Sequence, residues 1–186
     1  MLHPGLGKKG SMVPPAAQDR PEESLSLWSD SSEATFALGE WIGREAAGGE
    51  VLALIGPLGA GKTRFVQGLA KGMEVAERYI TSPTFILMQC YEGRLPLYHI
   101  DLYRMEKAAE MEALGLEEFL EGEGVAAVEW ADKGLEVLPP ARLTITFQYA
   151  GEDQRELHLS ASGPHYQEWL RKIREARRWK ILDGKN

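Results

Sequence analysis

A glycine-rich stretch constrains the fold of this chain more than any other feature. Residues 56–63 read GPLGAGKT and match the pattern G-x-x-x-x-G-K-[ST]. The run VLALI (51–55) precedes the stretch, and its continuous apolar character is typical of a strand buried on both faces. Apolar residues at helical spacing follow over 65–73. A strand, a glycine loop and a helix in this order are the context in which a P-loop binds phosphate.

The residue types of this loop suit a nucleoside triphosphate. Small side chains allow backbone N–H groups to turn inward around a phosphate, and a helix that begins near Lys62 adds the positive end of its dipole. The Lys62 ammonium is expected to reach the β- and γ-phosphates, and the Thr63 hydroxyl to bind Mg²⁺, which prefers oxygen ligands. ATP is the expected nucleotide, because the chain has neither the N-K-x-D loop of GTPases nor an LSGGQ sequence. The loop residues expected to bind the nucleotide are Gly56, Pro57, Leu58, Gly59, Ala60, Gly61, Lys62, Thr63 and Arg64.

A P-loop also requires a carboxylate near the metal, usually at the end of a neighbouring strand. Two candidates exist, since Glu129 lies at the end of the run VAAVEW and Asp101 follows the run LPLYHI. We assign Glu129 to the Mg²⁺ shell together with Thr63, and Asp101 to the orientation of water, although the sequence also allows the reverse assignment. These two carboxylates and the P-loop lysine are the candidate catalytic residues. Thr84, in a Ser/Thr-rich loop at 81–85, is expected to sense the γ-phosphate.

The order of patterns along the chain predicts the fold class. A strand pattern at 24–28 and the run before the P-loop alternate with helix patterns, and two later pairs of strands have the spacing of hairpins. This order predicts an α/β, three-layer P-loop NTPase domain with a mixed, mainly parallel sheet and a C-terminal β-hairpin and helix. Residues 101–122 are charged and helix-prone, with a break at Gly115. The expected hairpin strands lie at 85–91, 95–100, 142–149 and 155–161.

The chain is expected to form one domain. Residues 1–24 contain four prolines and no apolar core of signal-peptide type, so we expect a flexible leader there and a single domain over 25–186. No apolar run approaches the roughly 20 residues that span a bilayer. The one cysteine, Cys90, excludes an intrachain disulfide. These features favour a cytoplasmic protein without a membrane partner.

Charge is distributed unevenly along the chain. The net charge of −7 makes the chain a poor general binder of nucleic acid. Residues 163–186 are the exception, because they hold seven Lys or Arg and three Asp or Glu, a net charge of +4 that leaves −11 for the rest. An amphipathic basic helix is expected over 163–183. Its basic residues are interpreted as a solvated face in preference to a direct contact with tRNA or an acidic partner.

Four motifs, in this order, resemble the TsaE family of small bacterial P-loop ATPases, which is also called YjeE. They are GPLGAGKT, SPTF (82–85), YHIDLYR (98–104) and VEWADKG (128–134), and the resemblance covers about residues 25–160. It implies slow hydrolysis of ATP in the synthesis of threonylcarbamoyladenosine at adenosine 37 of ANN-decoding tRNAs. TsaB and TsaD are the implied partners that carry out the threonylcarbamoyl transfer. The resemblance further implies that the ATPase cycle supports their repeated turnover, and that contact with tRNA is indirect or weak.

The resemblance also implies roles for individual residues. Thr63 and Glu129 match the magnesium positions, and Asp101 matches a residue needed for hydrolysis. Thr84 lies in the switch-like loop. The helix start near Ser32 falls where the family approaches the nucleotide base.

One position departs from the family pattern. The family loop usually reads GDLGAGKT, whereas this chain has Pro57 in place of the aspartate. Proline has no N–H and a fixed φ, which a P-loop tolerates if that position donates no bond to phosphate. Because the carboxylate is lost, we expect ATP to bind while the rate of hydrolysis changes. Two alternatives to the ATPase are a small-molecule P-loop kinase and a non-catalytic, nucleotide-dependent binding module. The kinase is disfavoured because residues 102–124, where its arginine-rich lid would lie, are mostly acidic.

Overall fold

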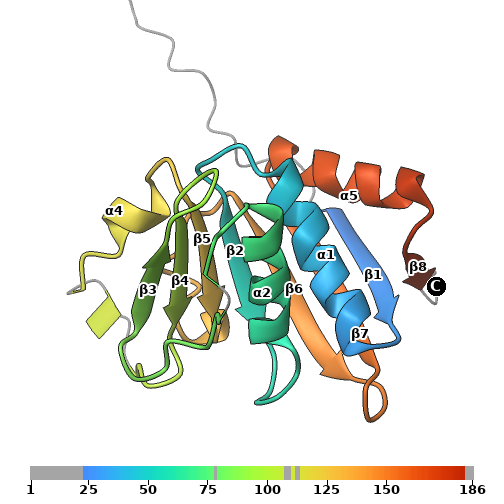
Figure 1. Ribbon diagram of the computed structural model, residues 1–186, viewed down its shortest axis with the longest axis horizontal. Coiled ribbons are helices and arrows are strands. Elements are labelled where there is room, and N and C mark those ends of the chain that lie inside the picture. The colour runs from blue at the N-terminus through green and yellow to red at the C-terminus, as the bar shows by residue number, and fades with distance from the viewer. Residues whose placement is uncertain (1–22, 78, 107–109, 112–113, 183–186) are drawn as a thin grey trace, which may run out of the picture.

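The fold is built around one eight-stranded sheet. The computed structural model describes residues 23–77, 79–106, 110–111 and 114–182. Its strands lie in the order β3-β4-β5-β2-β6-β7-β1-β8 (Figure 1). The elements in chain order are β1 (Glu23–Ser29), α1 (Ser32–Glu45), β2 (Val51–Ile55), α2 (Lys62–Gly72), β3 (Met88–Tyr91), β4 (Leu97–Asp101), α4 (Glu117–Leu120), β5 (Val125–Glu129), the 3-10 turn η1 (Ala131–Lys133), β6 (Arg142–Tyr149), β7 (Arg155–Ser162), α5 (Pro164–Ala176) and β8 (Lys180–Leu182).

The centre of the sheet is parallel and its flanks are antiparallel. β4, β5, β2 and β6 pair in parallel, whereas β3, β7, β1 and β8 join their neighbours antiparallel. The predicted mixed α/β fold with a parallel core is confirmed, as are the hairpins β3–β4 and β6–β7. The carboxyl ends of β4, β5 and β2 therefore meet at the edge of the sheet where the glycine loop leaves β2.

Two helices cover one face of the sheet. α1 and α2 lie in front of the central strands (Figure 1) and share a hydrophobic core with α5 and with side chains of β1, β2, β6 and β7. On the opposite face, residues between Leu102 and Leu138 cover β4, β5 and β2. Within the described part of the helix-prone segment 101–122, helix is confined to residues 110–111 and α4. Gly115, with φ +64°, interrupts this segment as predicted. The third layer is therefore thin.

Close packing of α1 against α2 depends on glycine. A Cβ atom at Gly39 of α1 would lie 2.1 Å from the Phe65 carbonyl oxygen, and one at Gly68 of α2 would lie 2.0 Å from the Phe36 carbonyl oxygen. Cβ atoms do not approach backbone oxygens so closely, because these distances lie far inside van der Waals contact. The two helices therefore pack backbone against backbone.

Gly68→Ala is expected to destabilise the fold by about 3 kcal/mol, because the added methyl group must force α1 and α2 apart. The measurement is the free energy of unfolding in urea. Lys71→Ala, on an exposed position of the same helix, is the control and should change that free energy by less than about 0.5 kcal/mol. Equal stability of the Gly68 variant and the parent would contradict the packing argument.

The C-terminal helix is shorter than the sequence predicts. The prediction of a helix over 163–183 is wrong over residues 177–182, because Arg177 adopts a left-handed conformation (φ 48°) and β8 then pairs antiparallel with β1. Trp179 and Ile181 pack against the core. Their alternate spacing is a strand period, which explains the change. At the other end β1 begins at Glu23, inside the predicted leader; residues 1–22 and 183–186 lie outside the described residues.

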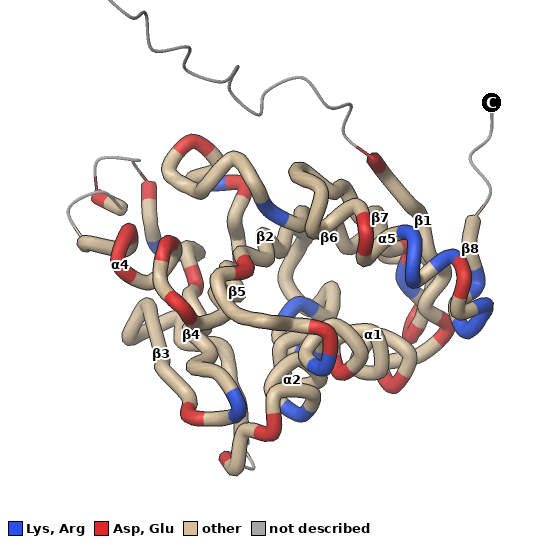
Figure 2. The backbone as a smooth tube through the Cα atoms, turned by 90° about the horizontal axis from the view of Figure 1, so that it is seen from above, with Lys and Arg blue, Asp and Glu red and all other residues tan. Residues whose placement is uncertain are grey.

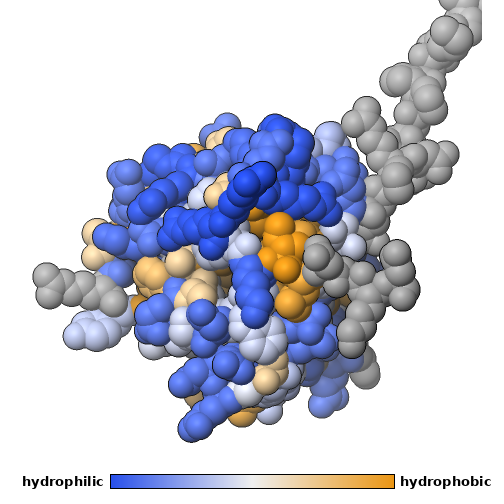
Figure 3. Space-filling view, turned by 90° about the vertical axis from the view of Figure 1, so that its right-hand side faces the viewer, coloured by the Kyte–Doolittle hydropathy of each residue, from blue (hydrophilic) through white to orange (hydrophobic). Residues whose placement is uncertain are grey.

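Positive charge gathers where α5 meets β8 (Figure 2). Hydrophilic side chains dominate this side of the molecule and surround a small apolar patch (Figure 3). Three cations of α5 itself pair with acidic neighbours, which supports the interpretation of that helix surface as a solvated face. The ion pairs are Arg171 with Glu168 and Glu175, Lys172 with Glu45, and Arg174 with Glu23. None of the helices in the described ranges is both long and apolar enough to cross a membrane.

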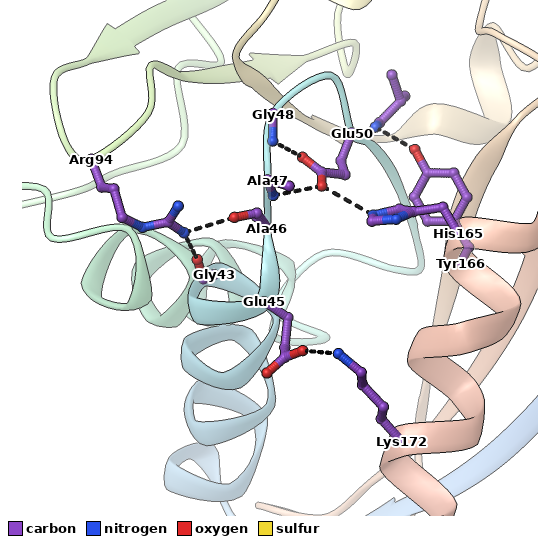
Figure 4. A network of polar contacts seen from close by, with 11 residues as sticks. Gly43, Glu45, Ala46, Ala47, Gly48, Glu50, Arg94, His165, Tyr166 and Lys172 are labelled. Atoms are coloured by element: carbon purple, nitrogen blue, oxygen red, sulfur yellow. Dashed lines mark hydrogen bonds and ion pairs between the residues drawn. The ribbon is translucent and has the colours of Figure 1, made fainter.

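A polar network joins α5 to the segment that leads into β2 (Figure 4). The buried Glu50 carboxylate accepts hydrogen bonds of 2.8 Å from two backbone N–H groups of the preceding turn and lies 3.0 Å from His165 Nε2. The Val51 N–H donates to the Tyr166 hydroxyl at 2.9 Å. Burial raises the pKa of Tyr166 to about 12, so this hydroxyl stays neutral. α5 thereby fixes the start of the strand that ends in the glycine loop.

Candidate functional site

The glycine loop connects β2 to α2 at the foot of both elements in Figure 1. Gly61 is the N-cap of α2 and has φ +107°, a conformation that favours glycine. The Ala60 N–H donates to the Pro57 carbonyl at 3.2 Å and closes a turn. Pro57, Leu58 and Gly59 form the exposed tip. The predicted sequence of strand, loop and helix is therefore confirmed.

Lys62 lies folded against this loop. Its side chain is buried, and Nζ donates to the carbonyls of Gly56 at 2.6 Å and Pro57 at 3.0 Å. The ammonium lies 4.0 Å from the centre of the Trp130 ring, a cation–π distance. Burial lowers the pKa of Lys62, and the nearby carboxylates of Glu129, Asp101 and Asp132 oppose that shift. The lysine is thus a desolvated cation close to two strand-end acids.

Thr63 and Glu129 meet at the carboxyl edge of the sheet. The Thr63 hydroxyl donates to Glu129 Oε1 at 2.8 Å, and the same oxygen lies 2.8 Å from His99 Nε2. Glu129 is buried and ends β5. The group contains a hydroxyl and a carboxylate oxygen, the donors that Mg²⁺ prefers, so these residues fit the predicted metal. Among the described residues no cluster of three or more His, Cys, Asp or Glu side chains forms a metal site.

Asp101 ends β4 beside Glu129, its partner in the parallel register of β4 and β5. One carboxylate oxygen, Oδ2, accepts hydrogen bonds from the Ser82 hydroxyl and from Thr84 Oγ1, the latter at 2.7 Å. The other, Oδ1, accepts from the Tyr103 backbone N–H at 2.8 Å. Asp101 therefore ties the Ser/Thr-rich loop to the strand end and keeps two hydroxyl groups near the P-loop.

A cavity of about 310 Å³ brings most of the predicted residues together. Gly56 and Pro57 do not line this cavity, and they contribute to the site through their carbonyls, which hold Lys62. Ser32 does not line it either and lies exposed in the first turn of α1. Arg64 lines this cavity and also a neighbouring one of about 420 Å³. The lining residues are Leu58, Gly59, Ala60, Gly61, Lys62, Thr63, Arg64, Ser82, Thr84, Asp101, Tyr103, Glu129 and Trp130.

Several residues at this site were not predicted to act there. His99 is fully buried, and its Nδ1 has no hydrogen-bond partner in the described part of the chain. The sequence feature that could have predicted its place is the alternation of side chains along a strand, which puts His99 on the same face of β4 as Asp101. Trp130 has φ 56° and its ring lies 5.0 Å from that of Tyr103, so the pair walls the cavity beside Lys62. Nothing in the sequence predicts this pairing.

The part of the chain that contains the site is similar to known proteins. Residues 29–157 match the model of a protein family described as "Threonylcarbamoyl adenosine biosynthesis protein TsaE". The chain is 46% identical over 136 residues to the tRNA threonylcarbamoyladenosine biosynthesis protein TsaE of Bacillus subtilis, across 73% of this chain and 84% of that relative. The protein of the same name from Treponema pallidum is 40% identical over 132 residues, across 71% of this chain and 97% of that relative.

A solved structure shares the fold. The crystal structure of Bacillus subtilis YdiB aligns with a TM-score of 0.71 and 37% sequence identity. The alignment covers 85% of this chain and 99% of the YdiB chain.

Proposed function

The chain belongs to the TsaE family, and on that premise we propose that it is an ATP-binding and slowly hydrolysing accessory subunit in the synthesis of N6-threonylcarbamoyladenosine at adenosine 37 of ANN-decoding tRNAs. It acts in the cytoplasm with TsaB and TsaD, which carry out the threonylcarbamoyl transfer, and it meets tRNA through them. The observation that supports ATP hydrolysis most directly is the 2.8 Å hydrogen bond between Thr63 and Glu129. A P-loop hydroxyl and a strand-end carboxylate are the groups that serve nucleotide-bound Mg²⁺ in P-loop proteins.

In this proposal the loop and Lys62 bind the phosphates of ATP. Backbone N–H groups at the start of α2 and the helix dipole favour an anion there. Lys62 lies close to the proposed phosphate site, since the carbonyls of Gly56 and Pro57 hold its ammonium at the loop. An ammonium that is already desolvated interacts more strongly with phosphate than one in water does.

Hydrolysis uses the two strand-end carboxylates in different ways. Thr63 and Glu129 would hold Mg²⁺, which supplies neutralisation of phosphate charge when it is bound. Asp101 orients the water that attacks the γ-phosphate, because it is a carboxylate at the same cavity with hydroxyl groups around it. The hydroxyls of Ser82 and Thr84 contact the γ-phosphate and report its loss to the loop that carries them.

A nucleotide-dependent binding module without hydrolysis is the second candidate, and Pro57 favours it. This residue replaces the aspartate that is usual in the family loop, so the loop lacks that carboxylate. Its side chain lies at the exposed tip of the loop and its carbonyl accepts from Lys62. ATP can therefore bind normally while turnover falls.

Hydrolysis of ATP with and without TsaB–TsaD, in the parent and in Pro57→Asp, tests these alternatives. We expect slow turnover in the parent that changes when TsaB–TsaD is added. Pro57→Asp should raise kcat about tenfold while the Kd for ATP stays within about twofold, because the carboxylate acts in the transition state and not in binding. Pro57→Ala is the control, since it removes the ring without adding a charge.

The other outcomes separate the candidates. A parent that binds ATP and supports TsaB–TsaD without any hydrolysis would favour the binding module. Transfer of phosphate from ATP to a metabolite, without the tRNA-modifying proteins, would favour the kinase. An interaction with TsaB–TsaD that does not depend on ATP would exclude the proposed role.

A further inference from the structure

The carbonyl oxygens at the tip of the P-loop are held by a hairpin that lies far away in the sequence. The Tyr149 hydroxyl, at the end of β6, donates to the Leu58 carbonyl at 2.6 Å. The Arg155 guanidinium, at the start of β7, donates through Nε to the Ala60 carbonyl at 3.1 Å and through Nη2 to the Gly59 carbonyl at 3.4 Å. Three consecutive carbonyls of the loop are thus bound from the β6–β7 side.

Tyr149 and Arg155 form one unit. They are directly opposite each other in the antiparallel register of β6 and β7, and the guanidinium lies 4.5 Å from the centre of the tyrosine ring. Arg155 Nη1 also binds the carbonyls of Gly151 at 3.3 Å, Glu152 at 3.0 Å and Gln154 at 2.8 Å, at the tip of the hairpin. Within the described ranges no carboxylate pairs with Arg155, so its donors serve the backbone of two loops.

These bonds determine where the loop N–H groups point. In a trans peptide unit the C=O and the following N–H point in opposite directions. Holding the carbonyls of residues 58, 59 and 60 toward the hairpin therefore aims the next three N–H groups away from it. That of Ala60 closes the turn onto Pro57, while those of Gly59 and Gly61 donate no hydrogen bond to the described part of the chain. Gly59 and Gly61 both line the cavity that contains Lys62 and Thr63.

We propose that Tyr149 and Arg155 are positioning residues that hold the P-loop in its phosphate-binding conformation before a nucleotide arrives. This rests on the proposed binding of ATP and adds to it two residues outside the P-loop. The tip needs such support, because Leu58 is 77% exposed and has little packing of its own. An unsupported loop loses conformational freedom when it binds phosphate, and that loss weakens affinity.

Gly59 supports the same conclusion. Its φ of +75° lies in the left-handed region, and a Cβ atom there would lie 2.8 Å from the Tyr149 hydroxyl. The conformation of the tip and the position of the hydroxyl are therefore matched to each other. A side chain at this position would both strain the backbone and displace the tyrosine.

The test is the affinity of the purified chain for ADP, ATP and AMP, with Tyr149→Phe, Arg155→Lys and Arg155→Ala. Tyr149→Phe removes one oxygen and should weaken ADP and ATP binding about tenfold, as expected for one lost hydrogen bond to an ordering contact. Arg155→Ala should weaken ADP and ATP binding further than Tyr149→Phe does. Arg155→Lys should retain only part of the affinity that Arg155→Ala loses, because an ammonium lacks the guanidinium fork. In these variants the affinity for ADP should fall more than the affinity for AMP, because the P-loop is proposed to hold the β-phosphate, which AMP lacks.

Gln148→Ala is the matched control, because Gln148 is the exposed neighbour of Tyr149 on the opposite face of β6. It should bind all three nucleotides as the parent does, and Tyr149→Phe should melt at the parent temperature. Parent-like affinity for ADP and ATP in Tyr149→Phe and Arg155→Ala would overturn the inference alone. A parent that binds no nucleotide would overturn the proposed function, and the inference with it.

Discussion

Lys62→Ala is expected to lower the affinity for ATP about 100-fold or more, because it removes the ammonium that the proposed site aims at the β- and γ-phosphates. The same change should leave the fold as stable as before. Burial lowers the pKa of Lys62, which means that the folded protein carries a desolvation cost for the charged amine. Loss of the amine removes that cost together with two hydrogen bonds to loop carbonyls. Isothermal titration with ATP and thermal unfolding measure the two effects separately.

Two variants control this experiment. Lys180→Ala removes an exposed lysine of the edge strand β8 and should bind ATP as the parent does. Lys62→Arg keeps the charge but adds bulk to a buried position, so it should recover little affinity. An ATP affinity of Lys62→Ala within a few-fold of the parent would show that the phosphates bind elsewhere.

Glu129→Gln is expected to lower kcat for ATP hydrolysis about 100-fold and to raise the Mg²⁺ concentration needed for half-maximal rate. Glutamine has nearly the shape of glutamate and can still accept from the Thr63 hydroxyl, so the change removes charge and little else. Binding of ATP in the absence of Mg²⁺ should stay within about twofold of the parent. The measurement is the rate of phosphate release across a series of Mg²⁺ concentrations.

Asp101→Asn distinguishes the two carboxylates. If Asp101 orients water, kcat falls while the Mg²⁺ dependence stays that of the parent. If the Mg²⁺ requirement rises in Asp101→Asn and not in Glu129→Gln, the reverse assignment holds. The structure gives a reason for the first outcome, because Glu129 receives the Thr63 hydrogen bond and Asp101 receives those of Ser82 and Thr84.

Local patterns made much of this fold predictable. The P-loop unit follows from an apolar strand, three glycines and an amphipathic helix that are contiguous in sequence, so no long-range information is needed. The strand ends at Asp101 and Glu129 were predictable for the same reason. The predicted C-terminal helix failed over residues 177–182, where Trp179 and Ile181 pack against the core and β8 pairs with β1. Tertiary contact overrode the helix-forming character of the segment.

The supporting residues of the site were harder to predict. The alternation of apolar residues along β6 correctly places Tyr149 on the face of the strand that carries the core residues. That residue is nevertheless 52% exposed and binds the P-loop instead of the core. Its partner loop arrives there only because β2 pairs with β6, a neighbour that is far away in the chain. A single sequence does not specify that pairing. The same holds for Arg155 and for the contact between His99 and Glu129.

The glycine contact between α1 and α2 also limits how this molecule can respond to a nucleotide. Because the two backbones pack closely at Gly39 and Gly68, we expect a shift of α2 to carry α1 with it. The loop with Ser82 and Thr84 is different, because the hydroxyl groups of these two residues hold it to the strand end by donating to Asp101. A phosphate can replace Asp101 as the acceptor of those hydrogen bonds. Motion between the nucleotide states should therefore concentrate on the β3–β4 side, where Phe85 and Ile86 stand 88% and 63% exposed. A partner that contacts those two side chains would distinguish the ATP-bound from the ADP-bound state directly.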